Sequence, residues 1–277
     1  MGVVNVTTDS FSDGGHHPDA DSAIRHALRL AGQGAAVIDV GGESTRPGAG
    51  RIDEATEMAR VLPVVEALVD KGLTVSVDTM RASTAEAAIR LGASIINDVS
   101  GGRADEDMLG VVASAGVDFV LMHWRAHSST MQEETDYVEV VGDVRAELLG
   151  QSALARNAGI DPDRIILDPG LGFSKTWEQN WELLAAIDRF TTLGHRVLVG
   201  ASRKRFLGEL LGGREPLGRD AATAAVSTWC AMNGVWAVRT HEVADQTDAV
   251  RVGERLATAM AHGPGWGRVQ EGEQGRR

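Results

Sequence analysis

Short runs of apolar, β-branched residues recur along the chain, and each is followed by a turn and a stretch with helical periodicity. Continuous apolar runs are typical of strands buried on both faces, whereas apolar residues spaced three and four apart predict amphipathic helices. The predicted strands are Val3–Val6, Ala35–Val40, Thr74–Asp78, Ser94–Asp98, Asp118–Met122, Arg164–Asp168, Arg196–Gly200 and Val235–Arg239. The predicted helices are Asp21–Gln33, Asp53–Asp70, Ser83–Leu91, Asp105–Ala115, Val138–Asn157, Gln179–Thr192, Asp220–Met232 and Asp245–Met260.

Strands that alternate with helices in this way predict an α/β protein with a parallel sheet covered on both faces. Eight such units in a chain of 277 residues match the size of a closed (β/α)8 TIM barrel. A doubly wound open sheet is the alternative, but no G-x-G-x-x-G motif follows the first predicted strand and no change in composition starts a second domain. We therefore expect one barrel domain over residues 1–262 and a flexible tail over residues 263–277, where apolar periodicity ends.

Composition narrows the range of partners. The net charge of −12 and the pI near 5.1 argue against nucleic acid and anionic membranes as partners, so any anionic substrate needs local basic groups. No stretch reaches the ~20 apolar residues of a membrane helix, and the N-terminus lacks a signal-peptide pattern. The single cysteine, Cys230, lies in an apolar helical segment and is expected to be a core thiol. These features predict a cytoplasmic protein that acts on small molecules.

In a TIM barrel the active site lies at the carboxyl ends of the strands, so the residues that end each run carry the most information. These ends are polar, and they form two chemical groups. The first comprises Asp78, Asn97, Asp168 and Lys204, whose acceptors, amide and cation suit the edge of a flat heterocycle that has N–H donors and a carbonyl. The second comprises Asn5, Arg239 and His241, which suit an anion such as a phosphate with a metal ion. A ring that carries a phosphate is the implied ligand.

Two long segments rich in Gly, Ser and Thr follow the first and second strands, over residues 7–17 and 41–51. We interpret them as candidate closing loops that carry Asp13, Thr45 and Arg46. The spacing of His123 and His127 is that of a metal-binding pair on a helix, but no accompanying Glu is present and the segment is expected to be a loop, so we do not predict a zinc site.

Two long motifs, MGVVNVTTDSFSDGG and GAAVIDVGGESTRPG, are followed along the chain by SVDT, INDVSGG, LDPGLGFSK, VGASRK and RTH. The two long motifs are similar to the two signatures of the dihydropteroate synthase family, and the shorter ones follow in that family's order, so the chain resembles this family over nearly its whole length. The resemblance implies a transferase of the alkyl or aryl (non-methyl) class that joins 6-hydroxymethyl-7,8-dihydropterin diphosphate to para-aminobenzoate in folate biosynthesis. It also implies Mg²⁺ as cofactor, no nucleic-acid or membrane partner, and a homodimer formed through helices of the C-terminal half.

The resemblance assigns roles to particular residues. Those implied to bind substrate are Asp13, Thr45, Arg46, Pro47, Asp78, Asn97, Met122, Asp168, Phe173, Lys204, Arg239 and His241. Those implied to act in catalysis are Asp78, Asp168, Lys204 and Arg239, and Asn5 is the implied Mg²⁺ ligand. Arg205 departs from the small residue that many members carry after SRK. Two alternatives stay open: a pterin-dependent methyltransferase domain and a non-catalytic paralogue that binds pterin.

Overall fold

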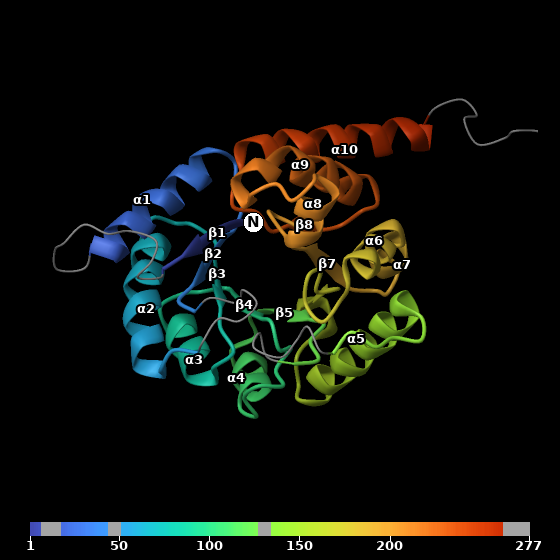
Figure 1. Cartoon of the computed structure of the whole chain (residues 1–277). Helices are drawn as coiled ribbons and strands as arrows, with labels where there is room; N and C mark the ends of the chain where they lie inside the picture. Colours follow the sequence, from blue (N-terminus) through green and yellow to red (C-terminus); the bar gives the residue numbers. More distant parts are fainter. Residues whose placement is uncertain (7–17, 44–50, 127–133, 263–277) are drawn as a thin grey trace, which may run out of the picture.

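Eight parallel strands form the centre of the computed structural model, which describes residues 1–6, 18–43, 51–126 and 134–262. They pair in chain order, and the helices lie outside them (Figure 1). The strands are β1 (Gly2–Asn5), β2 (Ile38–Gly41), β3 (Val75–Asp78), β4 (Ile95–Asp98), β5 (Asp118–Met122), β6 (Ile165–Asp168), β7 (Arg196–Val199) and β8 (Ala237–Val238).

Backbone contacts between the ends of the strand series close the sheet into a barrel. Gly2 forms an isolated parallel bridge with Thr240. The Val3 N–H donates to the Thr240 carbonyl, and the Thr240 N–H donates to the Met1 carbonyl, both at 2.9 Å. The segment after β8 therefore pairs with β1, and the predicted TIM barrel is confirmed.

Ten α-helices lie in the described part of the chain. They are α1 (Pro18–Gly32), α2 (Glu54–Asp70), α3 (Ala82–Arg90), α4 (Met108–Ala115), α5 (Val140–Asn157), α6 (Trp177–Ala185), α7 (Asp188–Thr191), α8 (Arg205–Leu210), α9 (Asp220–Met232) and α10 (Ala244–His262). The single helix predicted over Gln179–Thr192 is wrong in one respect: the chain leaves helical geometry at Ala186 and restarts at Asp188. This break lets both Ile187 and Phe190 be fully buried.

Local sequence signals explain where several helices begin and end. The Asp53 side chain accepts the Thr56 N–H at 2.9 Å and so caps α2. Thr176 and Gln179 form a reciprocal capping box at the start of α6. Gly116, with φ +64°, ends α4 in the left-handed conformation that glycine adopts without steric cost. Among the described helices, none is long and apolar enough to cross a membrane.

Alternation along the strands divides the core into two layers. Val37, Ile95, Val120, Ile166 and Leu198 form a small cluster that fills the inside of the barrel. The other strand face packs on the helices in a much larger cluster, which includes Val40, Val77, Phe119 and Leu167. Side chains at every second position therefore point into the barrel, and this periodicity decides which polar residues meet at its carboxyl end.

The reactivity of Cys230, which lies in α9, reports how tightly that helix is packed on the core. The side chain is fully buried, as predicted, and burial raises the pKa of the thiol to about 12. We expect the native protein to show no reaction with a disulfide reagent at pH 8, because both access and the thiolate form are missing. Absorbance at that pH, with urea-unfolded protein as the positive control, measures the reaction. Rapid modification of the folded chain would contradict this packing.

Candidate active site at the carboxyl ends of the strands

The inward-facing positions change from apolar to polar near the carboxyl ends of the strands. Asp39 lies two residues after Val37 and Asp168 two residues after Ile166, so each carboxylate continues a stripe that fills the barrel below it. Asp78 is in register with Asn97, and Met122 with Asp168. Most of the strand-end residues predicted from the sequence therefore converge on one mouth. Asp98 points to the opposite face, where its side chain accepts the backbone N–H groups of Ser100 and Gly102.

Arg239 is held at the mouth by two buried carboxylates. Its Nε lies 2.6 Å from Asp39 Oδ2, and its Nη2 lies 2.7 Å from Asp78 Oδ2. Burial disfavours the charge of the guanidinium, but Asp39 and Asp78 attract it more strongly, so the pKa of Arg239 lies above its ordinary value. Burial also raises the pKa of Asp78 to about 7, against the pull of Arg239. Asn97 completes the group, since its Nδ2 donates to Asp39 Oδ2 at 3.1 Å.

Asp39 is a site residue that the sequence reasoning did not assign. It is fully buried and pairs with both Arg239 and Asn97, so it orients two groups that face the mouth while exposing none of its own surface. Its Oδ1 has no hydrogen-bond partner among the described residues. The signal available in the sequence was its spacing of two from Val37, which places the carboxylate inside the barrel rather than in the turn that follows.

Asp168 and Lys204 form a second pair of charges at the mouth. Asp168 Oδ1 accepts the Gly170 N–H at 2.7 Å, and burial raises the pKa of this carboxyl against the attraction of Lys204. Lys204 Nζ donates to the Leu171 carbonyl and lies 4.6 Å from the centroid of the Phe173 ring. Burial lowers the pKa of Lys204 to about 8, and Asp168 opposes that shift. The ring of Phe173 and the ammonium of Lys204 thus form one wall of the mouth.

A strained turn directs Lys204 into the site. Arg203 has φ +59°, which is unfavourable for a residue other than glycine. Two hydrogen bonds from Arg203 to Asp220, at 2.7 and 2.8 Å, and one from Arg219 to the Arg203 carbonyl at 2.8 Å hold the turn. A Cβ at Gly200 would lie 3.9 Å from both Lys204 Nζ and Arg239 Cβ, which is ordinary van der Waals contact, so Gly200 lies between these two residues.

The predicted anion-binding residues lie where the barrel closes. Asn5 ends β1, and His241 follows the segment that bridges to Gly2. His241 Nδ1 lies 3.0 Å from Ser202 Oγ, and the His241 N–H donates to the same oxygen at 3.2 Å. Asn5 therefore ends the strand that lies next to the segment carrying both Arg239 and His241.

Arg81 is another residue that the motif reasoning missed. Its guanidinium donates to Glu43 at 2.9 Å, to Glu57 at 2.6 Å and to the Ile52 carbonyl. Glu43 and Ile52 stand on either side of residues 44–50, so Arg81 joins the two ends of that segment. Four predicted site residues lie outside the described residues: Asp13, Thr45, Arg46 and Pro47.

His123 belongs to a buried polar group beneath the segment that follows β6. Its Nε2 lies 2.9 Å from Glu147 Oε2 and its Nδ1 lies 3.0 Å from Lys175 Nζ. Burial lowers the pKa of His123 to about 4, and it lowers the pKa of Lys175 to about 7 against the attraction of Asp168. His127, the other member of the histidine pair, lies outside the described residues. Nothing in the sequence pattern marks Lys175 as buried.

Comparisons of sequence and of structure both find pterin-binding enzymes among known proteins. A family model described as pterin binding enzyme matches residues 1–241. The dihydropteroate synthase of Mycobacterium leprae is 52% identical over 258 residues, which cover 91% of this chain and 91% of that protein.

Two solved structures of Xanthomonas albilineans dihydropteroate synthase are similar to this chain. The structure with 4-aminobenzoic acid has a TM-score of 0.87 and 43% identity, and 92% of each chain is covered. The structure in complex with 7,8-dihydropteroate has a TM-score of 0.83 and 40% identity, again with 92% of each chain covered.

The Arg81 contacts lead to a prediction about stability. Replacing Arg81 with Gln leaves Glu57, which is almost fully buried, without its charge partner, and we expect a loss of about 3 kcal/mol in the free energy of unfolding. Arg90→Gln is the matched control, because it removes an exposed pair with Glu86 and should cost under about 1 kcal/mol. Urea denaturation of the two variants measures both values. Equal losses of unfolding free energy in the two variants would contradict the prediction that an unpaired, buried Glu57 destabilises the fold.

Proposed function

The chain belongs to the pterin-binding enzyme family, and on that premise we infer that its barrel mouth carries out the dihydropteroate synthase reaction. The enzyme joins 6-hydroxymethyl-7,8-dihydropterin diphosphate to para-aminobenzoate and releases diphosphate. The observation that carries the assignment is the convergence of buried acceptors with two cations at one mouth, in a chain that aligns with such synthases over 91% of its length. The assigned roles of single residues are proposals.

Asp78, Asn97 and Asp168 are proposed to bind the edge of the pterin. Each lies at the end of a strand, and all three are nearly buried. A carboxylate accepts two hydrogen bonds at once from a ring N–H and an adjacent amino group, so this set matches the pterin edge and would fit a phosphate poorly. From that edge of the ring, the carboxylates are proposed to stabilise electrostatically the positive charge that develops on the pterin.

The leaving diphosphate is proposed to lie against Arg239, His241 and Asn5. Arg239 supplies a fixed charge, and Ser202 orients His241. A Mg²⁺ ion fits this end of the mouth: Asn5 offers one amide oxygen, and Mg²⁺ characteristically takes few protein ligands when substrate phosphates supply others. Among the described residues, no group of three or more His, Cys, Asp or Glu side chains could hold a metal ion. When bound, the ion would neutralise charge on the leaving group.

The reaction is displacement at the pterin methylene. The lone pair of the aromatic amine forms the new C–N bond while the C–O bond to diphosphate breaks and its electron pair leaves with the diphosphate. The amine attacks as the free base, so its proton passes to solvent and no strong general base is needed. Lys204 and Phe173 are proposed to position the amine, since the ring and the ammonium face each other on one wall. This chain carries Arg205 at the next position, where its exposed side chain pairs with Glu209 at 2.8 Å.

Release of diphosphate tests the proposed function directly. The pterin diphosphate is incubated with the protein and Mg²⁺, with and without para-aminobenzoate. Amine-dependent release with formation of dihydropteroate is the expected result. Tight pterin binding with no release under any condition would instead indicate a non-catalytic binding protein or the methyltransferase alternative.

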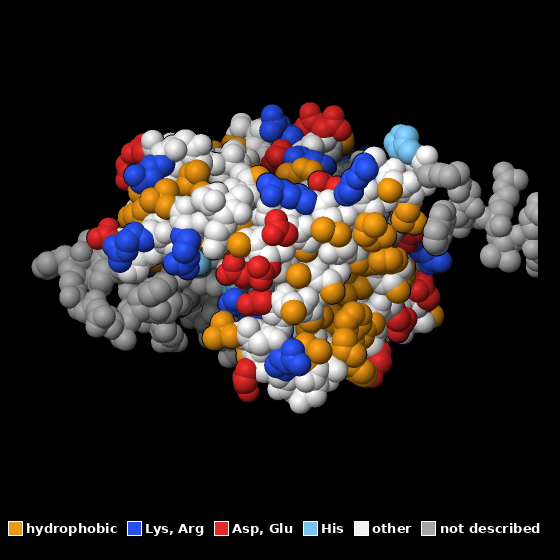
Figure 2. Space-filling view, turned by 90° about the horizontal axis from the view of Figure 1, so that it is seen from above, with side chains coloured by type: hydrophobic (Ala, Val, Ile, Leu, Met, Phe, Trp, Pro, Cys, Tyr) orange, Lys and Arg blue, Asp and Glu red, His pale blue; other side chains and the backbone are white. Residues whose placement is uncertain are grey.

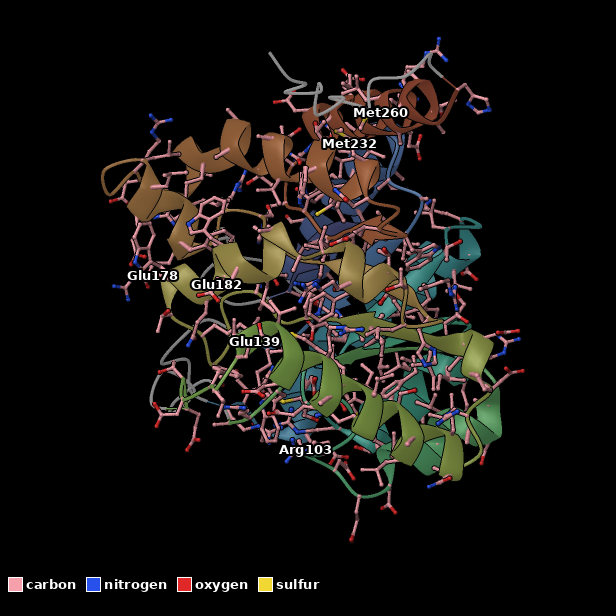
Figure 3. All side chains as sticks on the ribbon, turned by 90° about the vertical axis from the view of Figure 1, so that its right-hand side faces the viewer. Arg103, Glu139, Glu178, Glu182, Met232 and Met260 are labelled. Atoms are coloured by element: carbon pink, nitrogen blue, oxygen red, sulfur yellow. The ribbon has the colours of Figure 1, made fainter. Side chains whose placement is uncertain are left out.

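The two helices α9 and α10 present an apolar face that fits a proposed homodimer. Val252, Leu256 and Met260 form a stripe with a spacing of four along α10 and are 53%, 43% and 71% exposed. Trp229 of α9 is also partly exposed. Figure 2 views the molecule from above Figure 1, where α9 and α10 lie, and shows hydrophobic side chains gathered on one part of that face. Figure 3 shows Met260 of α10 on the same side of the molecule as Met232 at the end of α9. Such a contiguous patch is typical of an interaction surface.

The carboxyl groups at the mouth predict a pH dependence of pterin binding. Burial raises the pKa of Asp78 to about 7, so the carboxylate that accepts hydrogen bonds is lost as the pH falls below that value. We expect the affinity for 6-hydroxymethyl-7,8-dihydropterin, which lacks the diphosphate, to fall below pH 7 by up to about tenfold per pH unit. Calorimetric titration from pH 5.5 to 8.5 measures it. Asp78→Asn should lose the transition near pH 7, and an unchanged midpoint in that variant would contradict the role of Asp78.

The dimer predicts a change in mass. Light scattering should give about twice the chain mass of 29.3 kDa, and Leu256→Glu should halve that value because it places a charge in the apolar stripe. Glu254→Gln, on the same helix, is the matched control and should remain dimeric. A monomeric parent protein would disprove the dimer, and a dimeric Leu256→Glu variant would show that another surface forms it.

A further inference from the structure

The segment Gly170–Ser174 forms the floor of the proposed amine subsite, and its backbone is strained. Gly170, Gly172 and Ser174 have φ values of +68°, +78° and +48°, so every second residue is left-handed. Serine is unfavourable in that region, at a cost of about 1 kcal/mol or more. The Ser174 Oγ is buried and has no hydrogen-bond partner among the described residues, so its own side chain does not offset that cost.

This strained segment presents two groups to Lys204. The Leu171 carbonyl accepts a hydrogen bond from Lys204 Nζ, and the Phe173 ring lies 4.6 Å from the same nitrogen. The position of the Lys204 ammonium therefore depends on the conformation of residues 170–174. A shift of the segment would move the aromatic wall and the cation together. Asp78 and Asn97 would stay in place because the barrel holds them, and Asp168 contacts the segment through the Gly170 N–H.

Lys175 holds the segment from below. Its side chain is 3% exposed, and its Nζ donates to the Phe173 carbonyl at 2.9 Å and to the Gly170 carbonyl at 3.1 Å. The third proton points to His123 Nδ1 at 3.0 Å. Three acceptors require three N–H donors, so this geometry calls for the ammonium form. With all three protons engaged and the nitrogen enclosed, Lys175 does not reach a substrate or act as a proton acceptor.

Groups on α5 and the segment before it fix the orientation of Lys175. Because His123 Nδ1 accepts from Lys175, the proton of the neutral imidazole lies on Nε2, which donates to Glu147 at 2.9 Å. Arg125 pairs with Glu147 and stacks on Tyr137, with 3.7 Å between the guanidinium carbon and the ring centroid. Tyr137 in turn donates its hydroxyl proton to the Ser174 carbonyl at 2.8 Å. Residues 170, 173 and 174 are thus all held from this one side.

We propose that Lys175, supported by His123–Glu147 and Tyr137, is the positioning residue that sets the geometry of the aromatic-amine subsite. This inference rests on the proposed function, because it concerns the amine that the synthase uses. It assigns Lys175 mainly to the amine: the amine wall depends on residues 170–174, whereas Asp78, Asn97 and Arg239 are held by the barrel and by Asp39.

Steady-state kinetics of Lys175→Met, with each substrate varied in turn, tests the proposal. Methionine keeps an unbranched side chain, one atom shorter than that of lysine, and removes the donors and the charge. We expect the KM for para-aminobenzoate to rise at least about tenfold, because small displacements of positioning groups have large effects, while the KM for the pterin diphosphate changes less than about twofold. Hydrogen exchange should be faster at the amides of residues 170–175. Equal weakening of both substrates, or no change in either, would overturn the proposal.

Two further variants separate positioning from folding. Gln151→Met is the matched control, because Gln151 is also a buried polar residue, on α5, and should leave both KM values unchanged. Tyr137→Phe keeps the stacked ring and removes only the bond to Ser174, so it should raise the KM for the amine alone, by a smaller factor. If Lys175→Met does not fold, Tyr137→Phe decides by the same criterion. An inactive parent protein would refute the proposed function, whereas an active parent with unselective variants would refute the role of Lys175.

Discussion

The ion-pair group of Arg239 with Asp39 and Asp78 is the constraint on which the rest of the site depends. A guanidinium at the mouth of a barrel is costly to bury, and it is kept there because two carboxylates from adjacent strands contact it at 2.6 and 2.7 Å. The same contacts fix one side chain of the pterin-binding set, Asp78, and through Asp39 they also fix Asn97. The residues proposed to bind the pterin edge and the diphosphate are therefore parts of one connected group.

This arrangement explains how an acidic protein binds a diphosphate. The net charge of −12 describes the whole surface, while the mouth collects Lys204, Arg239 and His241 where the strands end. The buried carboxylates beside these cations set their positions, and the cations still face the mouth, where an anion would bind. The proposed amine side is built differently, from a strained segment held by Lys175, so the two proposed subsites have different supports.

Sequence periodicity was sufficient for the barrel and for most of the mouth, because buried parallel strands read as apolar runs and the fold brings their ends together. It did not assign Asp39, whose partners are Arg239, 200 positions away in the chain, and Asn97. Lys175 was missed for a related reason: its burial follows from the turn of residues 170–174, which no periodic pattern describes. Helix 179–192 was predicted as one element because the break at Ala186 serves tertiary burial of Ile187 and Phe190.

A double-mutant cycle between Asp39 and Arg239 tests the central claim most directly. Asp39 is fully buried, so it affects turnover only through the groups it holds. The kcat/KM for the pterin diphosphate is measured for Asp39→Asn, Arg239→Gln and the double variant. Because Asp39 acts in part through Arg239, the account predicts that the loss in the double variant is smaller than the product of the two single losses, a coupling of at least about 1 kcal/mol. Losses that simply multiply would contradict the claim that Asp39 acts by positioning Arg239.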